Sequence, residues 1–401
     1  MKAKPALPRH PEMHPRIAFL FNHDAAHQAA HIAAIAGQLA VRYPDLDVIA
    51  ATGTPDIAAH ICRLLTPDQI QALQWHDLSL PQWANILTAP LNRILPAQRV
   101  ARLYHGLDFF GSLDALVSTE RTCLRIKRRL AKTGRGAPRF IYVPHGSGDR
   151  NVAYHPELSQ FDLMLLSGQK LVDEMVAHSI CRTEQTRLIG YAKFDTVDMS
   201  ARPRFFDNDR PVFVYNPHFD PYLSSWYDHG PQLLDWFASP QGQDYNVIFA
   251  PHVMLFRKKL HISPEYRIAR RRPDVAAHWK SAPNIHIDID SPRLFDMSYM
   301  RAADAYIGDV SSQVYEFLAS PRPVFFINSH AKNAAAYDFW GNGPVVTSAA
   351  ELVPMLPDYV AHGAKHTAAQ QVKLNYTIDR SDNRPASIRG AEALADYLES
   401  E

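Results

Sequence analysis

Two histidines follow apolar runs at matching places in the two halves of the sequence. His145 comes after residues 140–143 and a proline and opens a Gly-Ser-Gly turn, and His252 comes after residues 246–250 and a proline. If both runs are buried strands, both imidazoles lie where a strand ends, a position suited to proton transfer. One could act as a general base while the other, protonated, stabilises charge on a phosphate. The competing interpretation is that both are ordinary surface residues of turns.

A serine pair follows a third apolar run. The run AYIG leads into Asp309, and Ser311 and Ser312 then open a pattern typical of a helix, with Glu316 one turn in. Free N–H groups at a helix start, together with two hydroxyl groups, bind a phosphate or pyrophosphate without a lysine. N-capping of the helix by either serine explains the pair equally well.

Three further histidines, His23, His27 and His31, recur every four residues on an expected helix. Their rings could share one face and bind a metal ion. A polar helix surface is the preferred interpretation. We therefore expect no metal site and no other cofactor.

The composition excludes several classes of protein. Lys and Arg total 42 and Asp and Glu total 41, a formal net charge of +1, and this balance disfavours a nucleic-acid partner. The sequence contains no GxxxxGK[ST], GxGxxG, GxSxG or HExxH pattern. Kinase, dehydrogenase and serine-hydrolase functions are therefore disfavoured.

The cysteines and the hydropathy pattern bear on location. Cys62, Cys123 and Cys181 are far apart, odd in number and without CxxC spacing, which fits a reducing cytoplasm better than a disulfide framework. The first apolar run, residues 17–21, is too short for a signal-peptide core. Since no stretch approaches 18 consecutive apolar residues, any membrane contact is expected to be peripheral.

A concentrated basic region stands out in this near-neutral chain. It comprises Arg121, Arg125, Lys127, Arg128, Arg129, Lys132, Arg135 and Arg139. It predicts attraction to anionic lipid headgroups or to a phosphorylated acceptor, and so a cytoplasmic protein at the inner face of the cell membrane. A solvated helix face is the alternative.

Short β-rich runs alternate with longer helical patterns, which is typical of parallel βαβ units in an α/β protein. In the first half we expect strands over residues 16–21, 46–51, 113–119, 139–143, 161–167 and 186–189. In the second half we expect strands over residues 211–216, 245–250, 285–289, 305–308 and 324–327. We expect helices over residues 24–43, 120–132, 168–180, 291–302 and 311–319, and one opened by Thr54 as N-cap with Pro55 in the first position.

These elements predict two domains. Residues 1–15 are expected to be a disordered tail, residues 16–200 an N-terminal Rossmann-like domain, and residues 201–401 a C-terminal Rossmann-like domain. The polar, proline-bearing stretch 198–210 is the candidate linker, and a final helix after Pro385 is expected to pack back on the N-terminal domain. The expected architecture is two Rossmann-like domains that face each other across a cleft, with ligands at the carboxyl ends of the strands.

The segments around His145, His252 and Ser311, taken in chain order, resemble motifs of the CDP-glycerol glycerophosphotransferase family. This family comprises the teichoic-acid primases and polymerases of GT-B fold. The run ADAYIGDVSSQVYEFLASPRPVFF is similar to the family's ADxLITDYSSxxxDF…PxxF segment. PHG at residues 144–146, GYAKFD at 190–195, VYNPHFD at 214–220 and PH at 251–252 follow in the family's order. The resemblance covers roughly residues 113–330.

The resemblance implies transfer of glycerol phosphate from CDP-glycerol, or another CDP-alcohol, to a hydroxyl of a lipid-linked, glycan or membrane-lipid acceptor. CMP is released and no metal is required. His145 matches the base that activates the acceptor, and His252 matches a contact to the donor phosphate. The resemblance thus makes residues 16–200 the acceptor-side domain and residues 201–401 the domain that binds the donor nucleotide. The residues matched to donor binding are Gly146, Asp309, Ser311, Ser312 and Glu316, the last of which stands where the family has aspartate.

The chain departs from the family pattern at cationic positions. Ser-Gly-Asp-Arg replaces the family's Thr-Pro and lysine after the histidine–glycine pair, and Phe219 replaces an arginine. Arg150, Lys193 or Arg257 could supply the missing phosphate contact. The alternatives are therefore a nucleotide-sugar glycosyltransferase, a UDP-sugar 2-epimerase-like enzyme of the same fold, or a nucleotide-binding subunit without catalysis.

Overall fold

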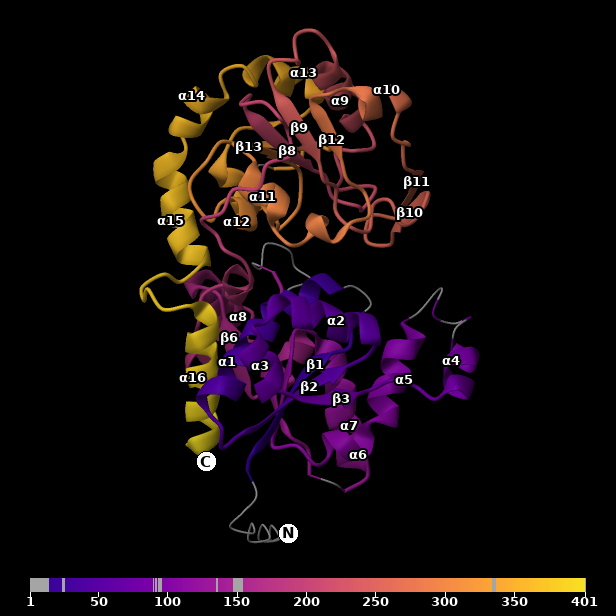
Figure 1. The fold of residues 1–401 in the computed structure, drawn as a ribbon, viewed down its shortest axis with the longest axis vertical. Helices are drawn as coiled ribbons and strands as arrows, with labels where there is room; N and C mark the ends of the chain where they lie inside the picture. The colour runs from indigo at the N-terminus through magenta and orange to yellow at the C-terminus, as the bar shows by residue number, and fades with distance from the viewer. Residues whose placement is uncertain are drawn as a thin grey trace. The chain divides into compact units, whose positions relative to one another are not determined.

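The chain forms two compact units, each built on one parallel sheet (Figure 1). The computed structural model describes residues 14–23, 26–88, 90, 92, 96–134, 136–146, 154–333 and 337–400. The first unit comprises Met1–His145, Tyr154–Thr196 and Asp379–Glu401. The second comprises Gly146–Ala153 and Val197–Ile378. The predicted α/β class with two Rossmann-like halves is confirmed.

The first unit has a seven-stranded sheet in the order β3-β2-β1-β4-β5-β6-β7, all parallel. Its strands are β1 (Arg16–Phe21), β2 (Asp47–Thr52), β3 (Gln74–Asp77), β4 (Ala115–Ser118), β5 (Arg139–Tyr142), β6 (Leu163–Leu166) and β7 (Thr186–Leu188). All except β3 fall on runs that the sequence predicts as strands. The edge strand β3 carries mostly exposed polar residues, so it lacks the apolar signal of its neighbours.

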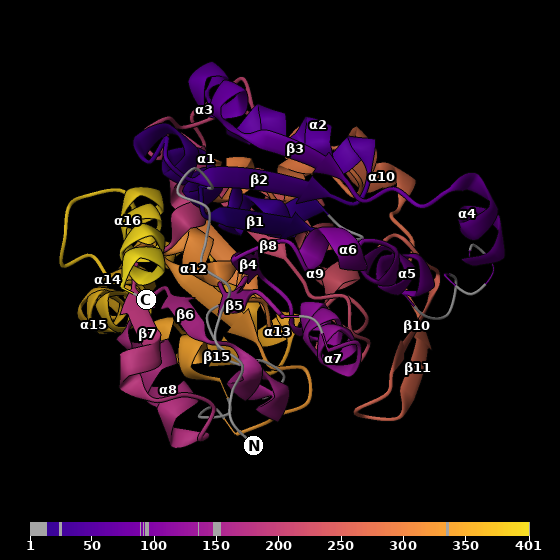
Figure 2. The ribbon, with the colours of Figure 1, turned by 90° about the horizontal axis from the view of Figure 1, so that it is seen from below.

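The helices of the first unit cover both faces of this sheet (Figure 2). They are η1 (Ala26–His31), α1 (Ala33–Arg42), α2 (Pro55–Leu64), α3 (Pro67–Ala72), α4 (Gln82–Thr88), α5 (Ala97–His105), α6 (Leu107–Phe110), η3 (Arg121–Cys123), α7 (Leu124–Lys132), η5 (Pro156–Gln160), α8 (Gln169–Ala177), η6 (Thr183–Gln185), η7 (Ala192–Thr196) and α16 (Ala386–Glu399). Thr54 caps α2 as predicted, since its side chain accepts the N–H of Ile57. The single helix expected over residues 24–43 is instead the 3₁₀ helix η1 followed by α1, because Ile32 N–H bonds three residues back to Ala29.

The last helix, α16, lies in the first unit, where it packs against α1. Leu394 and Leu398 share one buried apolar cluster with Ile17 and Ile35. Two residues of the GYAKFD segment hold the chain where it enters this helix. Asp195 accepts the backbone N–H of Ser387 at 2.6 Å, in the first turn of α16. Gly190 has φ +85, and a Cβ there would stand 3.0 Å from the carbonyl oxygen of Asp379.

The second unit has a six-stranded parallel sheet in the order β12-β9-β8-β13-β14-β15, and an antiparallel hairpin β10-β11. The strands are β8 (Val212–Asn216), β9 (Asn246–Phe249), β10 (Leu260–Ser263), β11 (Ile268–Arg271), β12 (Ile285–Ile287), β13 (Ala305–Gly308), β14 (Val324–Ile327) and β15 (Val345–Val346). Alternate residues of the central strands enter different apolar clusters: Val214 and Tyr306 lie in one, and Phe213 and Ile307 in the other. The sheet is therefore buried on both faces, as parallel sheets require.

The helices of the second unit are α9 (Gly230–Ala238), α10 (Ala277–Ser281), η8 (Pro292–Leu294), α11 (Ser298–Ala302), α12 (Val314–Phe317), η10 (Asp338–Asn342), α13 (Ala349–Leu352), η11 (Val353–Met355), α14 (Tyr359–Ala364) and α15 (Thr367–Thr377). Two predictions of helix length are wrong. The helix expected over residues 291–302 is the turn η8 and the short α11, and the helix expected over 311–319 is only the four residues of α12. Within the described residues, no helix is both long and apolar enough to cross a membrane.

The contact between Asp195 and Ser387 predicts how α16 is held. In Asp195→Ala, the first turn of α16 loses a side-chain acceptor, so we expect the free energy of unfolding to fall by about 1–2 kcal/mol. Amide hydrogen exchange in residues 386–399 should accelerate more than elsewhere. Glu184→Ala, which changes an exposed carboxylate of the same unit, is the matched control and should alter neither measurement. Unchanged exchange in α16 of the Asp195 variant contradicts this account.

Candidate functional site

In the first unit, polar side chains gather where the neighbouring strands β1, β4 and β5 end. His23 lies two residues after β1, Thr119 and Glu120 follow β4 directly, and His145 lies three residues after β5. The strands are parallel and adjacent in the sheet, so their carboxyl ends share one edge. This edge is where ligands bind in open α/β sheets.

His145 is exposed, and its Nδ1 lies 3.2 Å from the carbonyl oxygen of Thr119. A carbonyl oxygen only accepts hydrogen bonds, so Nδ1 carries the proton in this contact. In the neutral ring the lone pair is then on Nε2, which makes that nitrogen the basic one. The role of His145 as a general base remains a prediction, and this tautomer is compatible with it.

Two of the three histidines on the expected first helix are buried. His23 and His31 are each 5% exposed, so the predicted polar helix surface is wrong for these two residues, and the side chain of His27 lies outside the described part. His23 Nδ1 lies 3.5 Å from an oxygen of Glu120, which also forms an ion pair with Arg99. The ring of His31 packs edge-on against another aromatic ring, that of Tyr191, at 5.3 Å. The four-residue spacing predicts that the three rings share a polar face, but the structure buries His23 and His31 against other side chains of the protein.

The second unit brings a larger set of candidates to one sheet edge. His218 follows β8, His252 follows β9, and residues 309–312 follow β13. These three strands are adjacent in the order β9-β8-β13. The rings of the two histidines lie 5.2 Å apart, centroid to centroid.

The two histidines are oriented by the same backbone device. The Nδ1 of His218 accepts the N–H of Asp220 at 3.1 Å, and the Nδ1 of His252 accepts the N–H of Met254 at 3.2 Å. Because Nδ1 accepts, the ring proton is on Nε2 in each. The Nε2–H of each ring is a hydrogen-bond donor of the kind that suits a phosphate oxygen, and His218 is 3% exposed.

His218 is not among the residues predicted from the sequence, although the signal for it is present. Residues 212–216 are an apolar strand, and Pro217 and His218 follow, as a proline and a histidine do at His145 and His252. The family motif that this segment resembles has an arginine at the position of Phe219, and the resemblance assigns no role to His218.

Asp309 is fully buried and organises the loop that carries His218. One carboxylate oxygen accepts the N–H groups of His218 at 2.9 Å and Val310 at 2.6 Å. The other accepts the N–H and the hydroxyl of Ser225 at 2.7 and 2.8 Å. Burial nevertheless raises the pKa of this carboxyl to about 6. The donors that surround Asp309 are protein groups, so its place is that of a positioning residue.

The serine pair lies in a turn rather than at the start of a helix. Ser311 is 5% exposed and Ser312 is exposed. The N–H groups of Val314 and Tyr315 bond three residues back, to Ser311 and Ser312, so α-helical geometry begins only at Val314. The predicted helix start at Ser311 is therefore wrong, and the two hydroxyl groups lie in a turn. Binding of an anion by these serines remains a prediction. Glu316, in α12, is 4% exposed.

Asn216 joins this turn to the neighbouring strand ends. Its amide nitrogen donates to the carbonyl of Ala250 at 2.6 Å and to the side-chain oxygen of Gln313 at 3.0 Å, and its oxygen accepts the hydroxyl of Tyr306. The ends of β8, β9 and β13 are thus tied together beneath the two histidines and the serine turn.

The remaining predicted site residues differ in their surroundings. Gly146 is half-buried and is grouped with the second unit. Lys193, in η7 of the first unit, is 3% exposed, whereas Arg257 is exposed shortly after His252. Arg150 lies outside the described residues. Contacts of these cations with a phosphate remain predictions.

An aromatic group borders the same edge of the second unit and has no counterpart among the sequence predictions. The ring of Tyr222 stacks on Tyr266 at 3.9 Å and on His330 at 4.1 Å. Lys332 Nζ donates to the hydroxyls of Tyr266 and Tyr337 at 2.9 and 3.2 Å. Its members come from three separate segments of the chain, so no local sequence pattern predicts it.

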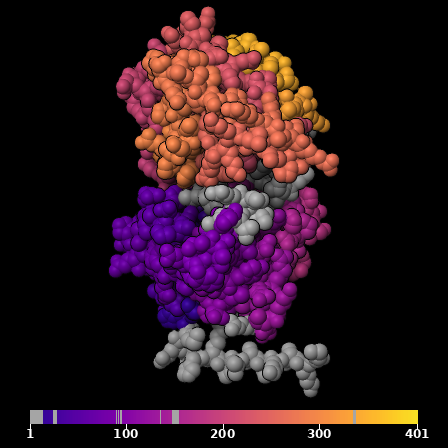
Figure 3. Space-filling view, turned by 90° about the vertical axis from the view of Figure 1, so that its right-hand side faces the viewer, coloured from indigo at the N-terminus to yellow at the C-terminus, as the bar shows by residue number. Residues whose placement is uncertain are grey.

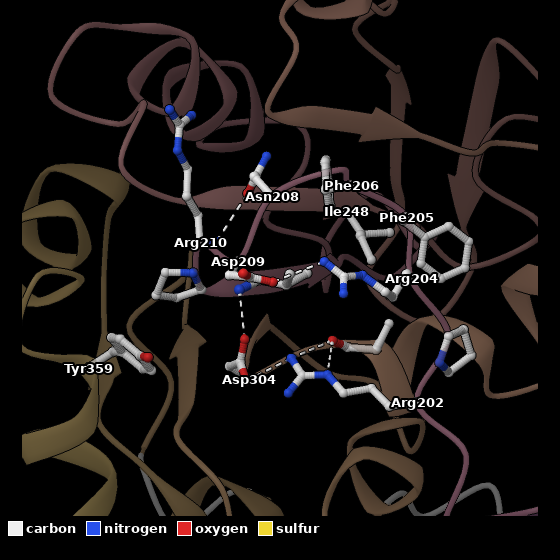
Figure 4. Close-up of a pocket in the computed structure, with 14 residues that line it drawn as sticks. Arg202, Arg204, Phe205, Phe206, Asn208, Asp209, Arg210, Ile248, Asp304 and Tyr359 are labelled. Carbon is white, nitrogen blue, oxygen red and sulfur yellow. Dashed lines mark hydrogen bonds and ion pairs between the residues drawn. The ribbon is translucent and has the colours of Figure 1, made fainter.

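A pocket of about 500 Å³ lies at the opposite edge of this sheet, beside the amino ends of β8 and β13 (Figure 4). There Asp304 accepts the N–H of Val212 at 2.8 Å and pairs with Arg202 at 2.7 Å. Arg202 also donates to the carbonyl of Ala302. These bonds attach the linker to the sheet, and the pocket contains none of the candidate histidines or serines.

Among the described residues, no group of three or more His, Cys, Asp or Glu side chains is arranged to hold a metal ion. The chemistry that the site offers consists of histidine nitrogens and hydroxyl groups.

Comparison with known proteins gives the fold a context. No family model and no curated protein matches the chain. A solved structure of the wall teichoic acid polymerase TagF matches with a TM-score of 0.56 at 14% identity, over 97% of this chain and 90% of that chain. The UDP-GlcNAc 2-epimerase of Neisseria meningitidis bound to UDP-GlcNAc matches with a TM-score of 0.56 at 11% identity, over 97% and 100%. Another UDP-N-acetylglucosamine 2-epimerase matches with a TM-score of 0.60 at 10% identity, over 97% of each chain.

These likenesses confirm the predicted GT-B type of fold and the structural resemblance to a teichoic acid polymerase. At such identities they show the fold and leave the reaction to be argued from the residues.

Asp309 predicts a pH dependence of stability. Its pKa is about 6 in the folded protein against an ordinary 3.8, so the folded state binds this proton more tightly than the unfolded state. Its contribution to stability is thus largest below pH 4 and is lost as the pH rises to about 6. The loss amounts to about 3 kcal/mol.

The Asp309→Asn variant cannot lose this proton, and its amide N–H₂ group meets donors. We expect it to be less stable than the wild type in urea unfolding at every pH. The difference in free energy of unfolding between the wild type and Asp309→Asn should shrink by about 3 kcal/mol between pH 4 and pH 7. Asp290→Asn, at an exposed aspartate of the same unit, is the control. A constant difference between wild type and Asp309→Asn over this range excludes the assigned pKa.

Proposed function

We propose that this protein is a transferase that moves glycerol phosphate from CDP-glycerol to a hydroxyl of a lipid-linked or glycan acceptor and releases CMP. The observation that carries the proposal is the edge of the second sheet, where His218, His252 and the Ser311–Ser312 turn offer neutral hydrogen-bond donors side by side. The donors suit the pyrophosphate of a nucleotide donor. Support also comes from the fold, which is shared with TagF, a protein studied after a soak with CDPG.

The proposed chemistry is an in-line displacement at phosphorus. The acceptor oxygen attacks the β-phosphorus of the donor, the bond from that phosphorus to the CMP oxygen breaks, and CMP leaves with the bonding electrons. The acceptor proton passes to the Nε2 lone pair of His145. Negative charge that grows on the phosphoryl oxygens is stabilised by the Nε2–H groups of His218 and His252 and by the serine hydroxyls.

A nucleotide-sugar enzyme is the second candidate. Structures of UDP-GlcNAc 2-epimerases match the chain as well as TagF does, and one of them contains UDP-GlcNAc. Phe219 also replaces a cationic residue of the glycerophosphotransferase pattern. The choice of nucleotide base separates the two candidates.

We further propose that the protein works in the cytoplasm at the inner face of the membrane. A lipid-linked or membrane-lipid acceptor would be presented there, and the basic region that contains α7 would meet anionic headgroups. The acceptor itself is defined only by its class, a compound with an accessible hydroxyl.

Thermal stability with added nucleotides tests the donor site. A ligand at one hundred times its dissociation constant stabilises the folded protein by about 2.7 kcal/mol. We expect an increase in Tm with CDP-glycerol, CDP and CMP that exceeds the increase with UDP and UDP-sugars. The double variant Ser311→Ala/Ser312→Ala should lose most of this nucleotide-induced increase in Tm. The control Ser281→Ala, at an exposed serine of the same unit, should retain the increase.

The alternative outcomes decide between the candidates. A uridine-selective increase in Tm favours the nucleotide-sugar enzyme. A cytidine-selective increase without CMP release from CDP-glycerol, tested with lipid-linked and glycan acceptors, indicates a binding subunit. No increase with any nucleotide rejects the donor site.

His145 is tested separately from donor binding. In His145→Ala we expect turnover to fall by about 10²–10⁴-fold because the base is lost, while the Tm increase with CDP-glycerol is unchanged. His178→Ala, at an exposed histidine of the first unit, should leave both measurements as in the wild type. Full turnover in His145→Ala eliminates its role as the base.

A further inference from the structure

The short helix α4 in the first unit is arranged with its apolar side outward. Trp83, Ile86 and Leu87 are 66%, 67% and 66% exposed, whereas the small Ala84 is 9% exposed. Spacings of three and four residues place the three large side chains on one face of the helix. This is the reverse of the usual pattern, in which the apolar face of a surface helix packs on the core.

The inward side of α4 is held by polar contacts. The amide nitrogen of Asn85 donates to the carbonyl of Leu80 at 3.1 Å, and the hydroxyl of Thr88 donates to the carbonyl of Ala84 at 2.7 Å. These polar contacts lie within α4 and between α4 and the segment that precedes it, so the side opposite the three large apolar residues carries small and polar groups.

The helix lies at the outer margin of its unit. It contacts α5, which in turn packs against α6 and α7. In both Figure 1 and Figure 2, α4 lies beyond α5 on the side away from the sheet. Figure 3 shows the molecule from the side on which α4 lies in Figure 1. Its apolar face thus projects from the body of the first unit.

Cations lie on the same group of helices. In α7, Lys127 pairs with Asp162, and Arg128 pairs with Glu157. A second set, Arg125, Arg129 and Lys132, is exposed, and within the described part of the chain these three form no ion pair. Their spacing of four and three residues places them along one stripe of α7.

We propose that α4 is an interfacial membrane anchor, whose Trp83, Ile86 and Leu87 enter the boundary between headgroups and acyl chains of a bilayer that contains anionic lipid. The stripe Arg125, Arg129 and Lys132 adds electrostatic attraction to the same surface. Tryptophan favours this boundary, and apolar side chains beside basic ones are typical of peripheral anchors. The proposal deepens the peripheral membrane contact named above and rests on that part of the proposed function.

A second copy of the chain is a poorer occupant. Stable protein interfaces bury about 800 Å² on each partner, which three side chains of a seven-residue helix do not provide. A symmetric contact would also bring like cations of two α7 helices toward each other. A bilayer requires neither a large area nor a complementary shape.

Vesicle flotation with the full-length protein tests the anchor. The probes are vesicles of phosphatidylcholine alone and of phosphatidylcholine with 30% phosphatidylglycerol. We expect the wild type to float with the anionic vesicles, and the triple variant Trp83→Ser/Ile86→Ser/Leu87→Ser to bind them at least tenfold more weakly. The matched control is Leu260→Ser/Ile262→Ser, which removes side chains of 56% and 64% exposure from the hairpin β10-β11 and should bind as the wild type does.

The contribution of α7 and the depth of insertion are measured in the same system. Arg125→Gln/Arg129→Gln/Lys132→Gln should weaken binding to the anionic vesicles by roughly fivefold for each charge and make the remainder less sensitive to salt. Lipids brominated near the headgroup should quench fluorescence in the wild type more than in Trp83→Phe. Equal quenching in the two proteins excludes insertion of Trp83.

Two outcomes overturn the proposal. Either the wild type does not float with any vesicle, or the α4 triple variant floats as well as the wild type. If that variant instead abolishes a dimer seen in sedimentation velocity, the apolar face is a contact between copies of the chain. The donor-induced increase in Tm is measured in parallel and should be the same in the α4 variant, so failure of the anchor and failure of the donor site are separate results.

Discussion

Asp309 is a carboxylate without exposed surface, placed where β13 ends beside the loop that follows β8. A buried charge is costly unless donors surround it, and here they are the N–H groups of His218, Val310 and Ser225 and the hydroxyl of Ser225. The loop can therefore move only if this set of bonds breaks. The indole of Trp340 donates to the carbonyl of Asp309 and ties a further segment to the same point. The loop that carries His218 and the start of the turn that carries the two serines are thus both bonded to this one residue.

The histidines show how a main chain can assign chemical roles. Where a carbonyl oxygen meets Nδ1, as at His145, the opposite nitrogen is left basic. Where a main-chain N–H meets Nδ1, as at His218 and His252, the opposite nitrogen becomes a donor. After the same sequence of strand and proline, the ring proton therefore lies on different nitrogens. The partner of His145 is a carbonyl that follows the neighbouring strand β4, whereas the partner of His218 and of His252 is an N–H in the turn that follows the histidine. Replacement of the neighbouring backbone geometry would change the chemistry without a change in the histidine itself.

The sequence predicts central strands well and edges poorly. The strands β1, β5 and β13 are buried on both faces and are therefore continuous apolar runs bounded by turn residues, which can be recognised in the sequence. The strand β3 and the hairpin β10-β11 are mostly exposed, and β15 has only two residues. These strands therefore show no periodicity of apolar residues from which they could be predicted. The site divides in the same way: His145 and His252 end apolar runs, whereas the burial of Asp309 and the turn at Ser311 depend on hydrogen bonds from distant segments. Such tertiary bonds have no local signature.

The first unit is interrupted along the chain by the whole of the second. Its central strand β1 and helix α1 are synthesised early, but Leu394 and Leu398, which complete the same apolar cluster, leave the ribosome only after the second unit. Closure of that core requires contacts across a loop that contains an entire domain, which is slow for entropic reasons. Domains are generally completed in the order of their synthesis. Here the first unit begins to be synthesised first but is completed last. Until α16 has been synthesised, the apolar surface of α1 that this helix covers must be shielded from water in some other way.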